Sequence, residues 1–397
     1  MNNSSAFGKT LMALAAIAVC LFWIFILQRN SLINHIEPPK LVMSFPVMGT
    51  IAEIQFYGDE KRTQKAADIV KKKFDEIEKT FSIFDPASEL AKLNSNAFNT
   101  PFQCSEQLWE LINKARFFHK ISDGAFDISC APLMELWGFY RKQGQLPKKS
   151  EVESTLQRVG LDKIIFDDKN HSVQFTVPGM RLDFGGVAKG YAVDLATEAA
   201  KAAGIKAGII NLGGNLKCLE EPPPKKKAYT IGIRDPFNKN SVCGTVELLN
   251  KSCSTSGNYE KYVNIEGKRF THIMNPSTGM PVENSISVTV ITESACDADA
   301  LSTSFFIQGE KILNKVLEHY PSIQILMITE TQENPLEITN ENISKDSERQ
   351  KNTDTNVEKE TATLPQSPYP IKIKKIGILW PEKLFFCEQN LGLENSY

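Results

Sequence analysis

Two kinds of hydrophobic pattern alternate along most of this chain, and their alternation limits the folds that it can adopt. Some segments repeat apolar residues every three or four positions, as an amphipathic helix does, and others are short apolar runs typical of strands. Interleaved helices and strands indicate a mixed α/β or α+β architecture. With 42% hydrophobic residues, the chain can bury a sizeable core. We therefore expect one large α+β domain over residues 42–328, with mixed sheets and packed helices.

Three helices and a series of strands are predicted within this domain. Apolar side chains recur at helical spacing over residues 63–81, and a second helix should begin after Ser105, which suits an N-cap. An alanine-rich helix over about 187–203 should end at Gly204, a residue type that favours the C′ position. The expected strands are IAEIQF (51–56), KIIF (163–166), SVQFTV (172–177), AGIINL (207–212), YTIGI (229–233), TVELL (245–249), SISVTVIT (285–292) and IQILMI (323–328).

The N-terminus carries an unbroken apolar run, LMALAAIAVCLFWIFIL, at residues 11–27. At about 17 residues it is at the short limit for a membrane span and long for the core of a cleaved signal peptide. No small-x-small cleavage site follows it, so residues 1–29 are interpreted as an uncleaved signal anchor. Lipoprotein processing at Cys20 is the alternative. Residues 30–41 would then be a polar linker.

The C-terminal part changes character at residue 329. Residues 329–366 are polar, charged and nearly free of aromatic side chains, so they cannot bury enough apolar surface to become ordered. The segment KIKKIGILW that follows is strand-like. We therefore expect a disordered polar insertion over 329–366, and a last edge strand within the segment 367–397.

Charge and cysteine content exclude some classes of protein and leave others open. A net charge of −2 argues against a general nucleic-acid binder. The cysteines show no zinc-ligand spacing, and buried thiols are their simplest interpretation. A Cys243–Cys253 bridge across a hairpin is conceivable in an oxidising compartment.

A carboxylate and a hydroxyl lie four residues apart in SACDADALSTSF (294–305). In a helix this spacing places Asp299 and Thr303 on one face, about one turn apart. Hard oxygen ligands of this kind suit Mg²⁺, which completes its coordination with water and substrate phosphates. An aspartate near a helix start is also a common capping residue, and a threonine on the same face is a common filler. The pair alone therefore leaves both interpretations open.

Colinear motifs over residues 42–330 resemble the family of FAD:protein FMN transferases, the ApbE-like flavin transferases. The matching segments are FPVMGT (45–50), FSIFDPASELAKLN (81–94), DGAFDIS (123–129), PLMELWGF (132–139), LDFGGVAKGYAVD (182–194), NLGGN (211–215), IGIRDP (231–236), STSGNYEKY (254–262), THIMNPSTGMPV (271–282) and ADALSTSFF (298–306). The resemblance implies transfer of the FMN part of FAD to a Thr or Ser hydroxyl of an acceptor protein, with release of AMP and with Mg²⁺ as cofactor.

The resemblance also implies roles for individual residues. Asp299, Thr303 and the backbone carbonyl of Gly186 match the metal ligands, although the family often has alanine at position 186. Lys189 would place a cation near the phosphates; the alternative is a solvated lysine at a helix start. His272 would act as the general base, because neutral imidazole can accept a proton near pH 7; alternatively it binds a phosphate.

Flavin recognition is implied at a further set of positions. Phe84 stands where tyrosine is common in the family, so a hydroxyl contact is lost while ring stacking remains possible. Asn275 replaces a frequent aspartate and removes a negative charge. The implied flavin-binding residues are Met48, Phe84, Ala125, Phe126, Asp127, Asp183, Lys189 and Ile273.

Three functions remain open at this stage. The first is FMN transfer to acceptor subunits of membrane redox complexes, with the catalytic domain on the periplasmic side of the inner membrane. The second is a metal-dependent FAD pyrophosphatase that uses water as the nucleophile. The third is a flavin-binding carrier without catalysis, against which the intact Asp299/Thr303 pair argues.

Overall fold

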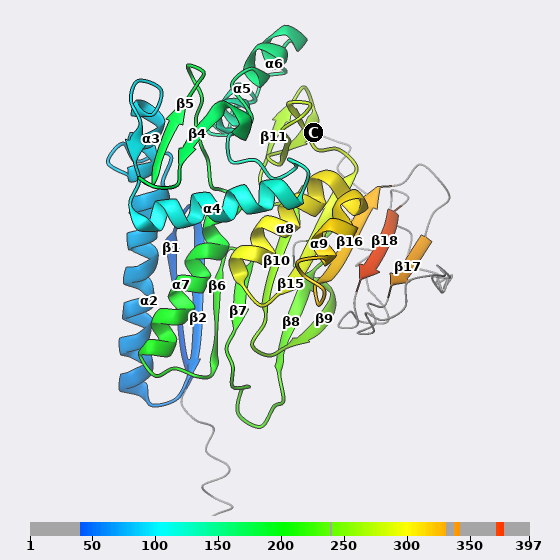
Figure 1. The fold of residues 1–397 in the computed structure, drawn as a ribbon. Coiled ribbons are helices and arrows are strands. Elements are labelled where there is room, and N and C mark those ends of the chain that lie inside the picture. The colour runs from blue at the N-terminus through cyan, green and yellow to red at the C-terminus, as the bar shows by residue number, and fades with distance from the viewer. Residues whose placement is uncertain (1–39, 239, 331–336, 342–370, 377–397) are drawn as a thin grey trace, which may run out of the picture.

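A mixed sheet forms the centre of the molecule (Figure 1). The computed structural model describes residues 40–238, 240–330, 337–341 and 371–376. The strand order in the described sheet is β1-β2-β6-β7-β10-β15-β16-β18-β17, and all neighbours are antiparallel except β17 and β18. The strands are β1 (Lys40–Val47), β2 (Thr50–Tyr57), β6 (Gly208–Leu212), β7 (Asn215–Cys218), β10 (Ser252–Gly257), β15 (Ser285–Thr292), β16 (Gln324–Glu330), β17 (Glu337–Glu341) and β18 (Ile371–Ile376).

Helices cover one face of this sheet, and the main hydrophobic core lies between the two layers (Figure 1). The long helix α2 buries the apolar stripe that the sequence predicts, with Val70, Phe74 and Ile77 fully enclosed. Strands β1, β2 and β6 and helices α4, α7 and α8 contribute side chains to the same core. The covering helices are α2 (Glu60–Phe81), α4 (Glu106–Ile121), α7 (Ala188–Ala202), α8 (Ala295–Gln308) and α9 (Leu313–Leu317).

A hairpin, β8 (Tyr229–Arg234) with β9 (Val242–Leu248), contributes to a second hydrophobic cluster. Strand β15 contributes to both cores, since Val288 and Val290 lie in the first and Ile291 lies in the second. Burial on both faces explains why β15 is an apolar run rather than an alternating strand.

Smaller elements surround the end of the sheet near α4 and connect the motifs of the site. They are α3 (Glu89–Asn96), β3 (Phe102–Gln103), α5 (Ala131–Leu136), α6 (Lys149–Leu156), η1 (Leu161–Lys163), β4 (Ile164–Asp167), β5 (Ser172–Phe175), β11 (Tyr262–Ile265), β12 (Lys268–Thr271), β13 (Met274–Asn275), β14 (Met280–Pro281) and η2 (Gly309–Ile312).

The local sequence signals for the helices are confirmed. Ser105 is the N-cap of α4, and its hydroxyl accepts a hydrogen bond from Leu108 N at 3.2 Å. Helix α7 ends at Ala202, and Gly204 has a φ of +84°, the left-handed conformation that favours glycine. Every strand expected from 51–56 to 323–328 is present, so the prediction of an α+β fold is confirmed.

Two boundary predictions require correction. Strand β1 begins at Lys40, inside the segment 30–41 that was expected to be a linker. In the segment 329–366, predicted to be disordered, β16 continues to Glu330 and β17 pairs in parallel with β18. Strand β18, the last one in the described ranges, is therefore not at the edge of the described sheet, because β17 lies outside it. Backbone groups of an open sheet edge can pair with a polar segment irrespective of its side chains, which composition does not reveal.

Several predictions concern residues outside the described ranges, which include the apolar run 11–27 with Cys20, residues 331–336 and residues 342–366. Within the described ranges, no helix combines the length and hydrophobicity needed to cross a membrane. Cys243 and Cys253 are both free thiols in the second core, so the conceivable bridge between them is not formed.

Helices α7 and α8 approach each other closely at Gly190. A Cβ atom placed on Gly190 would lie 2.8 Å from Asp299 Cβ and closer still to the backbone carbonyl of Ala295. A real side chain does not tolerate such contacts with rigid backbone. Glycine in a helix interior costs about 1 kcal/mol relative to alanine, so the close approach accounts for a residue that helix propensity disfavours.

Replacement of Gly190 tests this packing. We expect Gly190→Ala to lower the free energy of unfolding by about 1–3 kcal/mol, as overpacking does, despite the better helix propensity of alanine. Glu198→Ala, at an exposed position of the same helix, should change it by less than about 0.5 kcal/mol. Urea unfolding followed by circular dichroism measures both values, and equal stability of Gly190→Ala and wild type would contradict the proposed close packing.

Candidate functional site

Asp299 lies at the centre of the site, on the side of α8 that faces α7. Its side chain is buried, with 4% of the residue exposed, and Oδ2 accepts a hydrogen bond from Gly190 N at 3.0 Å. Lys189 Nζ lies 3.6 Å from the same oxygen. Oδ1 accepts no hydrogen bond within the described part of the chain. Burial raises the pKa of Asp299, and Lys189 opposes this shift. The buried carboxylate therefore has one oxygen available for a cation.

The capping alternative for Asp299 does not hold, since Ser294 is the N-cap of α8 and its hydroxyl accepts from Asp297 N at 3.2 Å. Asp194 of α7 provides a second cap. Its carboxylate accepts from Ala295 N at 2.7 Å and from Cys296 N at 2.9 Å. Asp194 lies one helical turn after Gly190, so one face of α7 fixes both the start of α8 and the carboxylate of Asp299. Sequence reasoning assigned no role to Asp194.

The structure also brings Gly186 and Thr303 together. A Cβ atom placed on Gly186 would lie 3.4 Å from Thr303 Oγ1 and 3.3 Å from Phe126 Cε2. Thr303 follows Asp299 by one turn of α8, as its spacing predicted. Within the described ranges, this site included, no group of three or more His, Cys, Asp or Glu side chains could hold a metal ion. A cation held here would therefore depend on one carboxylate, one hydroxyl and backbone oxygen.

The glycine loop before α7 positions two charged side chains. Lys189 Nζ donates to Gly185 O at 2.8 Å, which holds the ammonium over the loop beside Asp299. It is therefore not a freely solvated helix-start lysine. Asp183 accepts from Gly185 N at 2.8 Å and from the Tyr140 hydroxyl at 2.7 Å. Tyr140 was not identified from the sequence.

His272 belongs to the same cluster and is half-buried. Both its backbone N, at 3.1 Å, and its ring Nδ1, at 3.0 Å, contact the carbonyl oxygen of Lys261. A carbonyl only accepts hydrogen bonds, so Nδ1 carries the proton and Nε2 retains a free lone pair. Burial, together with the nearby Lys261 and Lys189 ammonium groups, lowers the pKa of His272 to about 4. The imidazole is therefore neutral at pH 7.

Lys261 is a further basic residue that sequence reasoning did not single out. Partial burial of the ammonium and repulsion from Lys189 lower its pKa. Its side chain forms no ion pair within the described ranges, whereas Lys189 is paired with Asp299. Two neighbouring ammonium groups beside a neutral histidine favour an anionic ligand. Lys261 lies in STSGNYEKY, directly before strand β11, and nothing in this local sequence indicates that it lies near Lys189 and His272.

The residues implied in flavin binding are only partly brought together. Phe84 is 70% exposed and packs edge-on against Tyr140, with ring centroids 5.4 Å apart, next to Asp183. Phe126 reaches Gly186, as described above, and Ala125 beside it is buried. Ile273 is buried directly after His272.

Asp127 and Met48 are less directly connected to the cluster. Asp127 Oδ1 accepts from Ser129 N and Oγ, and its Oδ2 lies 3.6 Å from His119 Nδ1. Burial raises the pKa of Asp127. This carboxylate therefore stabilises its own loop rather than contacting the other site residues. Met48 lies in the β1–β2 turn, where its backbone N donates to Glu78 Oε1 at 2.9 Å.

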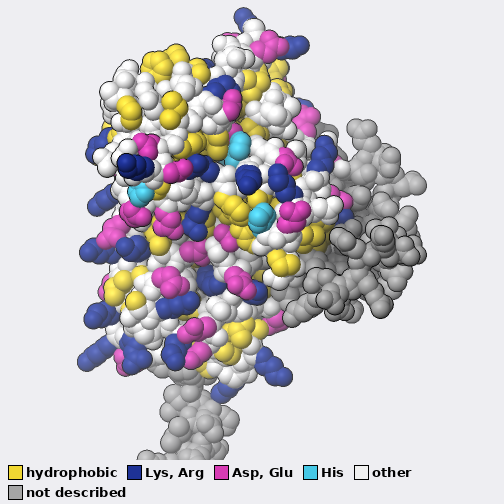
Figure 2. Space-filling view, viewed as in Figure 1, with side chains coloured by type: hydrophobic (Ala, Val, Ile, Leu, Met, Phe, Trp, Pro, Cys, Tyr) yellow, Lys and Arg dark blue, Asp and Glu magenta, His cyan; other side chains and the backbone are white. Residues whose placement is uncertain are grey.

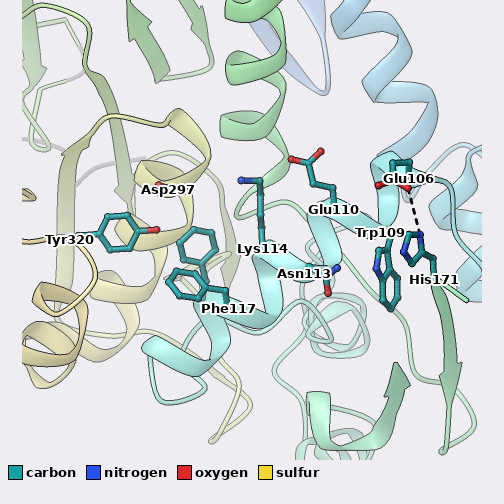
Figure 3. Close-up of a pocket in the computed structure, with 10 residues that line it drawn as sticks. Glu106, Trp109, Glu110, Asn113, Lys114, Phe117, His171, Asp297 and Tyr320 are labelled. Carbon is teal, nitrogen blue, oxygen red and sulfur yellow. Dashed lines mark ion pairs between the residues drawn. The ribbon is translucent and has the colours of Figure 1, made fainter. Parts of the chain in front are cut away.

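A pocket lies away from this cluster, on the outer side of α4 and α8 (Figure 3). Its volume is about 630 Å³, and it is lined along α4 from Glu106 to Phe117 and by Asp297 and Tyr320. Asp297 and Asp299 are two residues apart and so lie on nearly opposite faces of α8. On the face of the molecule seen in Figure 2, acidic and basic side chains are interspersed.

Comparisons with known proteins agree with the motif pattern. Residues 48–327 match the family model described as the ApbE family. The FAD:protein FMN transferase of Klebsiella pneumoniae is 28% identical over 290 residues, covering 72% of this chain and 88% of that protein. The enzyme of the same name from Escherichia coli K12 is 27% identical over 322 residues, covering 79% and 91%. The crystal structure of the ApbE protein from Thermotoga maritima superimposes with a TM-score of 0.67 at 32% identity, covering 73% of this chain and 94% of that chain.

The state of His272 can be measured without any assay of activity. We expect its imidazole to be neutral and protonated on Nδ1 at pH 7, and to gain a second proton only near pH 4. Nitrogen-15 NMR of histidine-labelled protein reports both the tautomer and the titration, and His272→Gln identifies the signal. Titration above pH 6, or a proton on Nε2, would contradict the geometry at Lys261.

Proposed function

Because this chain belongs to the ApbE family, we propose that it is a FAD:protein FMN transferase that attaches FMN to a Thr or Ser hydroxyl of an acceptor protein. The relatives that carry this enzyme name match over most of their own length. The observation that carries the proposal is the convergence of Asp299, Thr303, Gly186, Lys189 and His272 from three separate motifs.

The donor set fits a Mg²⁺ ion. The free Oδ1 of Asp299, the Thr303 hydroxyl and the Gly186 carbonyl would hold it, and Mg²⁺ accepts a single carboxylate when phosphates and water complete its octahedron. When bound, the ion neutralises negative charge on the reacting phosphates. Lys189 and Lys261 would add positive charge to the same region.

The reaction requires an acceptor hydroxyl to attack the phosphorus on the FMN side of the pyrophosphate. The bond between the acceptor oxygen and this phosphorus forms, the bridging P–O bond breaks, and AMP leaves with the bridging oxygen. His272 Nε2 would accept the hydroxyl proton, since the contact with Lys261 O leaves only this nitrogen unprotonated. A low pKa keeps the base free at neutral pH, although it reduces the driving force for proton transfer. Negative phosphates bound nearby would raise that pKa towards neutrality.

We also propose that the protein is attached to the inner membrane by residues 11–27, with the catalytic domain on the periplasmic side and membrane redox proteins as acceptors. The support is the apolar run and the absence of a cleavage site after it. The protein should fractionate with membranes and retain its first residues, as N-terminal sequencing would show. A lipid on Cys20 would contradict the anchor and favour lipoprotein processing.

Asp299→Asn tests the metal-binding carboxylate. The variant keeps the size of the side chain but loses its charge, so we expect FAD cleavage to fall to background even in excess Mg²⁺. Asp297→Asn, on the opposite face of the same helix, is the matched control and should retain wild-type turnover. AMP release and the mass of the acceptor protein are the two measurements.

The same experiment separates the proposed transferase from its alternatives. FMN on the acceptor supports transfer, free FMN with AMP would indicate a pyrophosphatase, and FAD binding without AMP release would indicate a carrier. Full turnover by Asp299→Asn would exclude Asp299 as an essential ligand.

A further inference from the structure

A cluster of hydroxyl groups lies beside Thr303, between α8 and β10, with Ser254 and Ser302 buried and Ser256 half-buried. Ser256 Oγ lies 2.9 Å from Ser302 Oγ and 3.4 Å from Thr303 Oγ1. Ser254 Oγ lies 3.3 Å from Ser302 Oγ. Each hydroxyl has one proton to donate, so the direction of these hydrogen bonds can be worked out from the ends of the cluster.

The direction is set first at Asn215. Ser254 Oγ lies 2.6 Å from Asn215 Oδ1, and an amide oxygen only accepts, so the proton of Ser254 is used there. Ser302 Oγ donates to Asp299 O at 3.0 Å, which uses the proton of Ser302. Ser302 then has no proton left for Ser256, and neither Ser254 nor Ser302 has one left for the 3.3 Å contact between them.

Ser256 must therefore donate to Ser302, and the contact with Thr303 can be a hydrogen bond only if Thr303 donates. The next residue of α8 behaves differently, because Ser304 Oγ donates back to Ala300 O at 2.7 Å. Thr303 makes no such bond to its own helix, and Ser256 is the one hydrogen-bond partner of its hydroxyl in the described ranges. The proton of Thr303 thus points towards β10, and its lone pairs are left for the side of Gly186.

We propose that Ser256 is a positioning residue that turns the hydroxyl of Thr303 so that its lone pairs, and not its proton, face the cation. The inference rests on the metal site of the proposed function. A hydroxyl whose proton pointed into the site would repel a divalent cation. Groups that orient metal ligands in this way typically change metal affinity 10–100-fold when removed.

The test measures metal binding directly, with Mn²⁺ as the probe and without FAD. Electron paramagnetic resonance of free Mn²⁺ gives the dissociation constant for the metal-free full-length protein. We expect Ser256→Ala to raise this constant about 10–100-fold and Ser256→Thr, which keeps a hydroxyl, to restore part of the affinity. Ser254→Ala is the matched control, because it removes a hydroxyl of the same strand and cluster that does not contact Thr303. Thermal unfolding of each variant confirms that it is folded.

The outcomes separate the inference from the proposed function. Near wild-type affinity in Ser256→Ala, or an equal loss in Ser254→Ala, would overturn the positioning role while leaving the metal site intact. A wild-type protein that binds no Mn²⁺ would overturn both the metal site and this inference. If the Mn²⁺ affinities of the variants are as expected but the acceptor protein stays unmodified, the positioning role of Ser256 is supported and only the transfer step is refuted.

Discussion

The close contact between α7 and α8 is the constraint on which the site depends. Because Gly190 has no side chain, α8 can come close enough for Gly190 N–H to donate to the carboxylate of Asp299. Asp194, also on α7, accepts hydrogen bonds from the first turn of α8. A buried carboxylate is unfavourable unless it is hydrogen-bonded and paired. The backbone N–H of Gly190 and the ammonium of Lys189 meet that need in part, both at Oδ2. Thr303 lies one helical turn further along α8, near Gly186. Without this contact, neither the carboxylate nor the hydroxyl would have a defined position.

Electrostatics in the site follow from the same arrangement. Lys189 is paired with Asp299, whereas Lys261 has no ion-pair partner among the described residues, and both lie near His272. Burial, together with this positive charge, lowers the pKa of His272, and the positive charge favours an anion in the same region. A neutral base next to cations is consistent with chemistry on a phosphate, where both functions are needed at once.

Much of this arrangement could be predicted from the sequence. The features that could not be predicted share one physical cause. Helix 63–81, the cap at Ser105 and the Asp299/Thr303 spacing depend on residues close together in the chain, so local patterns reveal them. Asp194, Tyr140 and Lys261 act through contacts with residues many positions away, which periodicity and propensity do not encode. The pairing of β17 with β18 was missed for a related reason, since composition describes side chains and this pairing is made by the backbone.

The contact between His272 and Lys261 shows how a backbone contact responds to amino-acid substitution. The carbonyl that determines the protonated nitrogen of His272 is supplied by the main chain, so any residue at position 261 that keeps the local conformation provides it. Only the ammonium depends on the side chain being lysine. The tautomer of His272 therefore depends on the conformation of the loop, whereas the positive charge beside it depends on the lysine side chain. A substitution at position 261 would change this charge without changing which nitrogen is basic.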